Sequence, residues 1–187
     1  MQRGFALWFT GIPAAGKTTV ARAVEHRLRE MGLRVENLDS DEIRSMISPN
    51  LGYTPEARDE NTRRLAFMAQ LLSRNDVAAI VAAVSNRRMF RERARSMVAN
   101  FVEIWVKCPL EVCQRRDPKG LYARAARGEV NDIAGLHLPY EEPPDPELVL
   151  ETDKETVAES VERVLAKLAE LALIPTAVAD APEVSAQ

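Results

Sequence analysis

Short apolar segments alternate with longer amphipathic ones along most of this 187-residue chain. The apolar segments have the length and composition of buried strands, and the amphipathic ones repeat apolar residues at helical spacing. The predicted strands are 5–10, 34–38, 76–84, 101–107 and 148–150. The predicted helices are 19–31, a short one ending at 47, then 55–73, 87–99, 109–116 and 154–173. This alternation predicts a three-layer α/β fold, a parallel sheet with helices on both faces.

The pattern breaks down over residues 117–146, which are polar, carry several Gly and Pro residues and lack a long periodic repeat. A connection this long within a compact domain is usually functional, so we expect a lid over an active site. The Ala-rich end of the chain, 174–187, has no pattern and is predicted to be a disordered tail. Residues 1–173 are therefore expected to form a single domain.

Composition narrows the possible partners and surroundings. A formal net charge of −3 argues against wholesale nucleic-acid binding. Cys108 and Cys113 lack the spacing of a zinc site, and two reduced thiols are expected. No apolar run has the roughly 18 residues that a membrane span needs, and no signal peptide is recognisable. We expect a cytoplasmic protein that contacts neither nucleic acid nor membrane.

One motif indicates the ligand. Residues 11–18 read G-x-x-x-x-G-K-T, the phosphate-binding P-loop pattern, between a predicted strand and a predicted helix. Lys17 would reach the β- and γ-phosphates, and the Thr18 hydroxyl would help to hold Mg²⁺. The chain is therefore expected to bind ATP. The candidate ATP-binding residues of the loop are Gly11, Ile12, Pro13, Ala14, Ala15, Gly16, Lys17, Thr18 and Thr19.

Polar residues after the other strands should meet the P-loop, because ligands bind at the carboxyl ends of parallel strands. Asp39 and Asp41 follow the second strand, and residues two apart in an extended segment point the same way. One carboxylate could hold a metal-bound water while the other accepts a proton from a substrate hydroxyl. The alternative is helix capping, since Asp41 precedes a predicted helix.

Arginines and an amide follow on the next helices. Arg58 and Asn61 share a helical face and, with Arg44, could hold an anionic acceptor, although a solvated charged face is the default for such clusters. The basic helix that contains Arg91 and Arg95 is predicted to present a solvated or intersubunit face rather than to bind nucleic acid.

Taken together, these blocks resemble the adenylylsulfate kinase (APS kinase) family over residues 5–168. The most specific block is RDPKGLY at 116–122. The others are the P-loop, LDSD at 38–41 with Arg44, LGY at 51–53 with Arg58, ENTRR at 60–64, AAVS at 82–85, PLEVC at 109–113, PYE at 139–141 and PELVL at 146–150. The resemblance implies a nucleoside-monophosphate-kinase-like P-loop fold, often dimeric, and transfer of the ATP γ-phosphate to the 3′-hydroxyl of adenosine 5′-phosphosulfate (APS).

The resemblance also implies a role for each candidate residue. Asp41 would be the base for the 3′-hydroxyl, Asp39 would act near Mg²⁺ beside Thr18, and Lys17 would stabilise the transferred phosphate. The implied acceptor-binding residues are Asp41, Arg44, Tyr53, Arg58, Asn61, Ser85, Lys119 and Ile133. Either Arg115 or Arg116 would lie near the ATP base, and we take Arg115 as the candidate. ATP sulfurylase, which would supply APS, is a possible functional partner.

The chain departs from the family pattern at several positions. Pro13 and Ala14 replace the usual Ser and Gly, Asn86 and Arg87 follow Ser85 in place of Pro and Tyr, and Ser40 replaces Gly. Ile133 stands where the lid normally carries a Phe that stacks on the acceptor adenine, a contact worth ~1–3 kcal/mol. Two alternatives therefore stay open, namely a kinase for another nucleotide-like acceptor and a non-catalytic nucleotide sensor.

Overall fold

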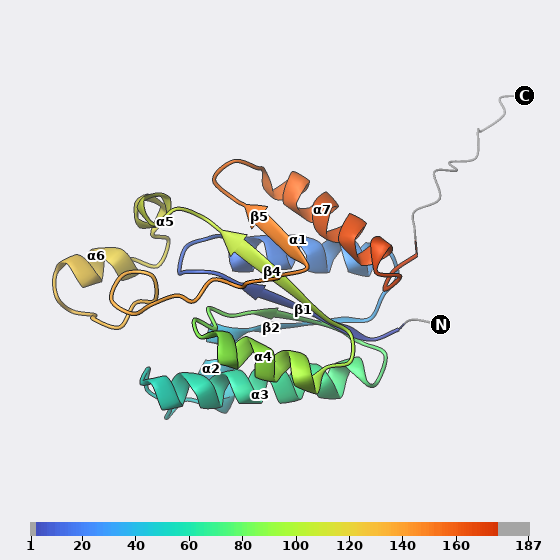
Figure 1. Ribbon diagram of the computed structural model, residues 1–187, viewed down its shortest axis with the longest axis horizontal. Helices are drawn as coiled ribbons and strands as arrows, with labels where there is room; N and C mark the ends of the chain where they lie inside the picture. Colours follow the sequence, from blue (N-terminus) through green and yellow to red (C-terminus); the bar gives the residue numbers. More distant parts are fainter. Residues whose placement is uncertain (1–2, 176–187) are drawn as a thin grey trace, which may run out of the picture.

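The structure, a computed structural model, describes residues 3–175. Within them five parallel strands form one sheet in the order β2-β3-β1-β4-β5 (Figure 1). The strands are β1 (Phe5–Thr10), β2 (Val35–Asp39), β3 (Ala78–Ala82), β4 (Phe101–Lys107) and β5 (Leu148–Glu151). The helices are α1 (Lys17–Glu30), α2 (Ser40–Ile47), α3 (Pro55–Ser73), α4 (Arg88–Met97), α5 (Leu110–Arg116), α6 (Leu121–Ala126) and α7 (Val157–Glu170).

Helices cover both faces of the sheet, as the alternating pattern predicts. Leu7 and Phe9 of β1 pack with α1 and α7 in one apolar cluster, whereas Ala6 and Trp8 pack with α3 and α4 in another. Side chains alternate between faces along a strand, so β1 supplies both clusters and is buried throughout. The three-layer α/β fold is confirmed. No helix of residues 3–175 is long and apolar enough to cross a lipid bilayer.

Several predicted boundaries shift for local reasons. α1 begins at Lys17 rather than at 19, directly after the left-handed Gly16. β3 is shorter than the predicted 76–84, because Asp76 is in a left-handed turn and the Val84 carbonyl accepts the Thr10 hydroxyl. α7 begins at Val157, where Thr156 and Glu159 form a capping box. Ile174 is buried in the core, and the remainder of the predicted tail from 176 lies outside the described residues.

Residues 117–146 contain the short helix α6, whose first turn is held by the Asp117 carboxylate through the N–H groups of Tyr122 and Ala123. One expectation is wrong. The basic helix α4 does not present a solvated face at Arg91, whose side chain is only 2% exposed and pairs with the buried Glu103. Arginine spacing alone could not reveal this carboxylate on β4.

Candidate active site

The predicted site residues meet at the carboxyl ends of the strands, where they line a cavity of about 1150 Å³. Of the candidates named above, all but Gly11, Ile12, Ala15 and Arg115 are among its lining residues. The cavity extends from the P-loop past α2 and α3 to the segment 116–134 that includes α6. The order of strands and helices along the chain thus correctly predicted that these distant residues meet at one edge.

The P-loop leaves β1 at the centre of the sheet and runs into α1. A Cβ at Gly11 would lie 2.4 Å from the Val106 carbonyl oxygen, so the loop needs glycine there. Ala14 has a φ of 61°, a left-handed conformation that costs an alanine about 1–2 kcal/mol. The APS kinase family, which the sequence resembles, commonly has glycine at this position. In this chain the same loop conformation is less favourable, because the residue is alanine.

Lys17 folds back onto its own loop. Its Nζ donates to the Gly11 and Ile12 carbonyl oxygens, at 2.9 Å each. The ammonium is therefore near the centre of the loop, from which it could move to phosphate oxygens. Burial lowers the pKa of Lys17 to about 8, and the Asp41 carboxylate offsets this only in part.

Asp39, rather than Asp41, caps the helix that follows. Its Oδ1 accepts the Asp41 backbone N–H at 3.0 Å, and its Oδ2 accepts the Thr18 hydroxyl at 2.8 Å. Asp39 is only 8% exposed, so these two bonds fix its carboxylate beside the P-loop. The capping alternative thus applies to Asp39, and it leaves the Asp41 carboxylate available for another role.

Asp41 lies in the first turn of α2, and its side chain is 68% exposed. Its carboxylate forms an ion pair with Lys119, which comes from the lid. The Asp41 partner favours the charged form of Lys119 and raises its pKa. A cation of the predicted lid and the candidate base are therefore joined by an ion pair.

Two of the candidate acceptor residues, Arg44 and Arg58, lie over the exposed ring of Tyr53. The Arg44 and Arg58 guanidinium groups lie 4.4 Å and 5.4 Å from the centre of the Tyr53 ring. Asn61 donates to the Ser40 hydroxyl at 3.2 Å, while its buried Oδ1 accepts no hydrogen bond within residues 3–175. Two cations, an aromatic face and an unused acceptor in one wall suit an anionic nucleotide.

The predicted lid, residues 117–146, contacts the residues around this cavity. The Arg58 guanidinium donates to the Asp132 carbonyl oxygen at 2.7 Å, and the Tyr122 hydroxyl donates to the Pro13 carbonyl oxygen at 2.9 Å. A Cβ on Gly135, which has a φ of 86°, would lie 2.6 Å from Ile12 Cγ2, so lid and P-loop touch here. Ile133 lines the cavity but is 3% exposed and packs in the core cluster of α1 and α7.

On the ATP side the structure distinguishes the two arginines. Arg116 lines the cavity and donates to the Thr152 carbonyl oxygen at 2.5 Å, whereas Arg115 is exposed and is not among the lining residues described. Thr152 also donates its hydroxyl to the Ala15 carbonyl oxygen at 2.7 Å. Sequence reasoning missed Thr152, although its position directly after β5 is the same kind of signal that identified Asp39 after the second predicted strand.

We predict that ATP affinity falls as pH rises through about 8. When no ATP is bound, Lys17 loses its proton near pH 8. Binding of the phosphates requires the protonated ammonium, so the affinity for ATP should fall by up to about tenfold per pH unit above that value. Calorimetry at pH 7, 8 and 9 with fixed Mg²⁺ would measure this and the accompanying proton uptake. Dissociation constants that stay flat over this range would refute it.

The same shift has a stability consequence of definite sign. The unfolded chain keeps the ordinary Lys pKa of 10.5, so between pH 8 and 10.5 it binds more protons than the folded protein. The contribution of Lys17 therefore destabilises the fold fully below pH 8, and this cost disappears as pH rises to 10.5.

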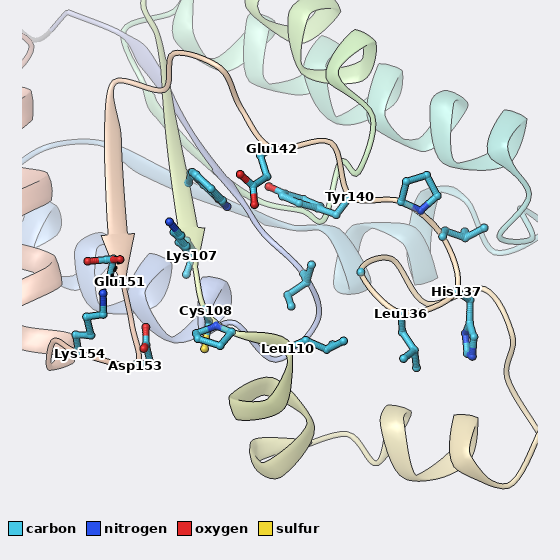
Figure 2. A pocket seen from close by; sticks show the side chains of 17 residues that line it. Lys107, Cys108, Leu110, Leu136, His137, Tyr140, Glu142, Glu151, Asp153 and Lys154 are labelled. Atoms are coloured by element: carbon cyan, nitrogen blue, oxygen red, sulfur yellow. Dashed lines mark hydrogen bonds and ion pairs between the residues drawn. The ribbon is translucent and has the colours of Figure 1, made fainter.

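A second cavity of about 670 Å³ lies on the other side of the P-loop, between the ends of β4 and β5 and the chain returning from the lid. Figure 2 shows Tyr140 on this returning segment, and Lys107, Glu151 and Lys154 at the ends of the two strands. We call residues 135–142 the strap. Gly135 to Tyr140 wall the second cavity, while the adjoining Ile133 and Ala134 line the first. The position of the strap therefore shapes both cavities.

Comparisons of the sequence and of the structure with known proteins find members of the same family. Residues 3–151 match the family model described as adenylylsulphate kinase. An adenylyl-sulfate kinase of Halothermothrix orenii is 48% identical over 169 residues, which cover 90% of this chain and 91% of the relative. The structure of a Mycobacterium tuberculosis APS kinase in complex with AMPPNP and APS superposes with a TM-score of 0.86, at 38% identity, covering 90% of this chain and 99% of that one. A hexameric APS kinase from Thiobacillus denitrificans superposes with a TM-score of 0.71 at 32% identity, over 92% of this chain and 30% of that one.

Proposed function

This chain belongs to the adenylylsulfate kinase family and is an ATP-dependent kinase, and we propose how its residues carry out the reaction. It transfers the γ-phosphate of ATP to the 3′-hydroxyl of APS, giving 3′-phosphoadenosine 5′-phosphosulfate and ADP. The observation that carries the assignment is the single cavity in which the P-loop, Asp41 and the Arg44–Tyr53–Arg58 cluster meet.

Asp41 is the proposed base that takes the proton from the 3′-hydroxyl as the γ-phosphate is transferred. Its side chain is exposed to the cavity and does not cap α2, because Asp39 is the N-cap of that helix. Its ion pair with Lys119 occupies a carboxylate oxygen that the base would need for the 3′-hydroxyl. We therefore propose that bound substrates draw Lys119 to their phosphates and release Asp41 to act.

Lys17 is the proposed cation for the β- and γ-phosphates, where it stabilises charge in the transition state. Arg44, Arg58 and Asn61 would hold the phosphosulfate acceptor, the two arginines through its anionic groups, and Tyr53 would contact its adenine. Ile133 offers that adenine an apolar contact rather than an aromatic one. Arg116, more than the predicted Arg115, is the proposed contact for the ATP base, because it lines the cavity.

Mg²⁺ fits the oxygen atoms available beside the P-loop. Thr18 Oγ1 and Asp39 Oδ2 are 2.8 Å apart, and residues 3–175 contain no cluster of three or more His, Cys, Asp or Glu that could hold a metal. Mg²⁺ in kinases is usually held by one or two protein oxygens together with phosphates and water, so this sparse set suits it. Thr18 and Asp39 would hold Mg²⁺, which would supply positive charge to the phosphates of ATP.

We propose a homodimer as the working assembly, and the cytoplasm, where ATP is abundant, as the location. A functional link to ATP sulfurylase follows from the chemistry, since an enzyme that consumes APS needs one that makes it. A gel-filtration mass measurement and a pull-down with that enzyme would examine the two partnerships separately.

The decisive test is ADP release by the purified protein with ATP and Mg²⁺, comparing APS, adenosine monophosphate and no acceptor. We expect turnover that depends on APS. Tight ATP binding without APS-dependent turnover would overturn the assignment, leaving a kinase for another nucleotide-like acceptor or a nucleotide sensor.

A further inference from the structure

The buried Arg91 of α4 joins three parts of the molecule. Its Nε donates to Glu103 of β4 at 2.7 Å, while its two terminal nitrogens donate to the Ser85 and Glu141 carbonyl oxygens, at 2.6 Å each. A planar guanidinium can serve three acceptors in fixed directions, which a lysine ammonium on a flexible chain does less well. Arg91 thus connects the sheet, the loop after β3 and the strap.

The first of the two carbonyls belongs to the rim of the active-site cavity. Ser85 and Asn86 line that cavity, and Ser85 has a φ of 42°, a conformation that residues other than glycine rarely adopt. Such a conformation persists only where its surroundings hold it. Here the Trp8 indole donates to the Ser85 hydroxyl at 3.2 Å, and Arg91 holds the Ser85 carbonyl oxygen.

The second carbonyl belongs to the strap, which is bound to the same loop at several points. Asn86 Nδ2 donates to the Pro139 carbonyl oxygen at 3.0 Å, the Glu141 N–H donates to the Asn86 carbonyl oxygen at 2.8 Å, and Arg87 pairs with the Glu141 carboxylate at 2.8 Å. Of the usual family residues, Pro at 86 has no side-chain donor and Tyr at 87 carries no positive charge, so neither would reproduce these two side-chain contacts. The departures noted in the sequence therefore bind the strap.

A further contact ties the strap to the base of the P-loop. The Tyr140 hydroxyl lies 2.9 Å from the hydroxyl of Thr10, the last residue of β1, and the Arg91 guanidinium lies 5.7 Å from the Tyr140 ring centre. In Figure 2 the Tyr140 side chain extends from the strap across the end of the second cavity. Fixing Tyr140 and Glu141 fixes where the lid returns to the sheet.

We propose that Arg91 is a positioning residue for the acceptor half of the reaction. It fixes the position of the Ser85–Asn86 rim relative to the strap. The strap in turn positions Asp132 and Ile133 at the cavity that binds the acceptor. The inference rests on the proposed function. Because Arg91 is absent from the residues that line the cavity, it acts through these backbone groups and not by touching substrate.

The test is Arg91→Lys, which keeps a cation beside Glu103 and loses the three-way fork. We expect the KM for APS to rise about tenfold or more and kcat to fall, with the ATP dissociation constant unchanged within about twofold, since misplacing a supporting group by about 1 Å can cost 10²-fold. Arg93→Ala is the matched control on the same helix, since Arg93 pairs with Asp59 of α3 and leaves the strap alone. It should leave both constants unchanged.

Amide hydrogen exchange of the ligand-free proteins tests the coupling without relying on activity. In Arg91→Lys, peptides covering 84–88 and 136–142 should exchange about tenfold faster or more, while the β1 and β4 peptides stay protected. If Arg91→Lys does not fold, Arg91→Met/Glu103→Gln, which removes both buried charges, takes its place.

The possible outcomes distinguish a failure of the positioning role of Arg91 from a failure of the proposed function. Unchanged exchange in both peptides, an unchanged KM for APS, or equal losses for ATP and APS would each overturn the positioning role. A wild-type protein that is inactive with APS would instead refute the proposed function, and the exchange experiment would still decide whether Arg91 couples the rim to the strap.

Discussion

Asp41→Ala is expected to remove most turnover, by about 10²–10⁴-fold, because general-base catalysis contributes a factor of that size. ATP binding should change little. The Asp41 carboxylate makes its one side-chain contact within residues 3–175 to Lys119, and Asp39 supplies the cap of α2, so the fold should survive. Steady-state kinetics and ATP calorimetry on the same preparation would measure the two effects.

Two further variants sharpen the assignment. Asp41→Asn keeps the size of the side chain and removes the base, so it should match the alanine variant in turnover. Asp39→Asn should instead weaken ATP–Mg²⁺ binding together with turnover, because Asp39 contacts Thr18. A collapse of ATP affinity in Asp41→Ala would show that Asp41 serves the metal or the fold and would reject its role as the base.

Much of the fold could be predicted because local pattern and global architecture agree. The run FALWFT is apolar at five of its six positions, and β1 is buried on both faces at the middle of the sheet. The rule that ligands bind at the carboxyl ends of parallel strands then brought Lys17, Asp39 and Ser85 together without knowledge of strand order. The structure agrees with that placement, since all three line one cavity.

Contacts between distant side chains could not be predicted from the same patterns. The arginines of α4 looked like a solvated face, because a buried carboxylate such as Glu103 has no signature in a strand that reads FVEIWVK. The sequence suggested Asp41 as the helix cap, whereas the structure has Asp39 in this role. The difference of two residues is within the usual error of helix boundaries. The contact from Arg91 to the Glu141 carbonyl oxygen depends on the path of the strap, which follows from tertiary packing and not from any local repeat.

Lys17→Met should lower turnover by about 10²–10³-fold and yet leave the protein at least as stable as the parent. Removing one preorganised charge from a phosphoryl-transfer site costs about 10²–10³-fold in kcat, and ATP affinity should fall as well. Stability moves the other way. The folded state lowers the pKa of Lys17 to about 8, so at pH 7 it holds a cation that burial disfavours, and methionine removes this cost.

Thermal unfolding at pH 7 and at pH 10 separates these contributions. At pH 7 the Tm of Lys17→Met should equal or exceed that of the parent, and the difference should shrink toward pH 10 as the parent loses the Lys17 proton. Lys167→Met on α7, which breaks a surface ion pair with Glu170, is the matched control and should leave turnover intact. A fall of several degrees at pH 7 would mean that the bonds from Lys17 to Gly11 and Ile12 hold the loop together. Lys17 would then stabilise the folded state as well as serve the reaction. Its charge would not lower the stability of the fold in exchange for catalysis.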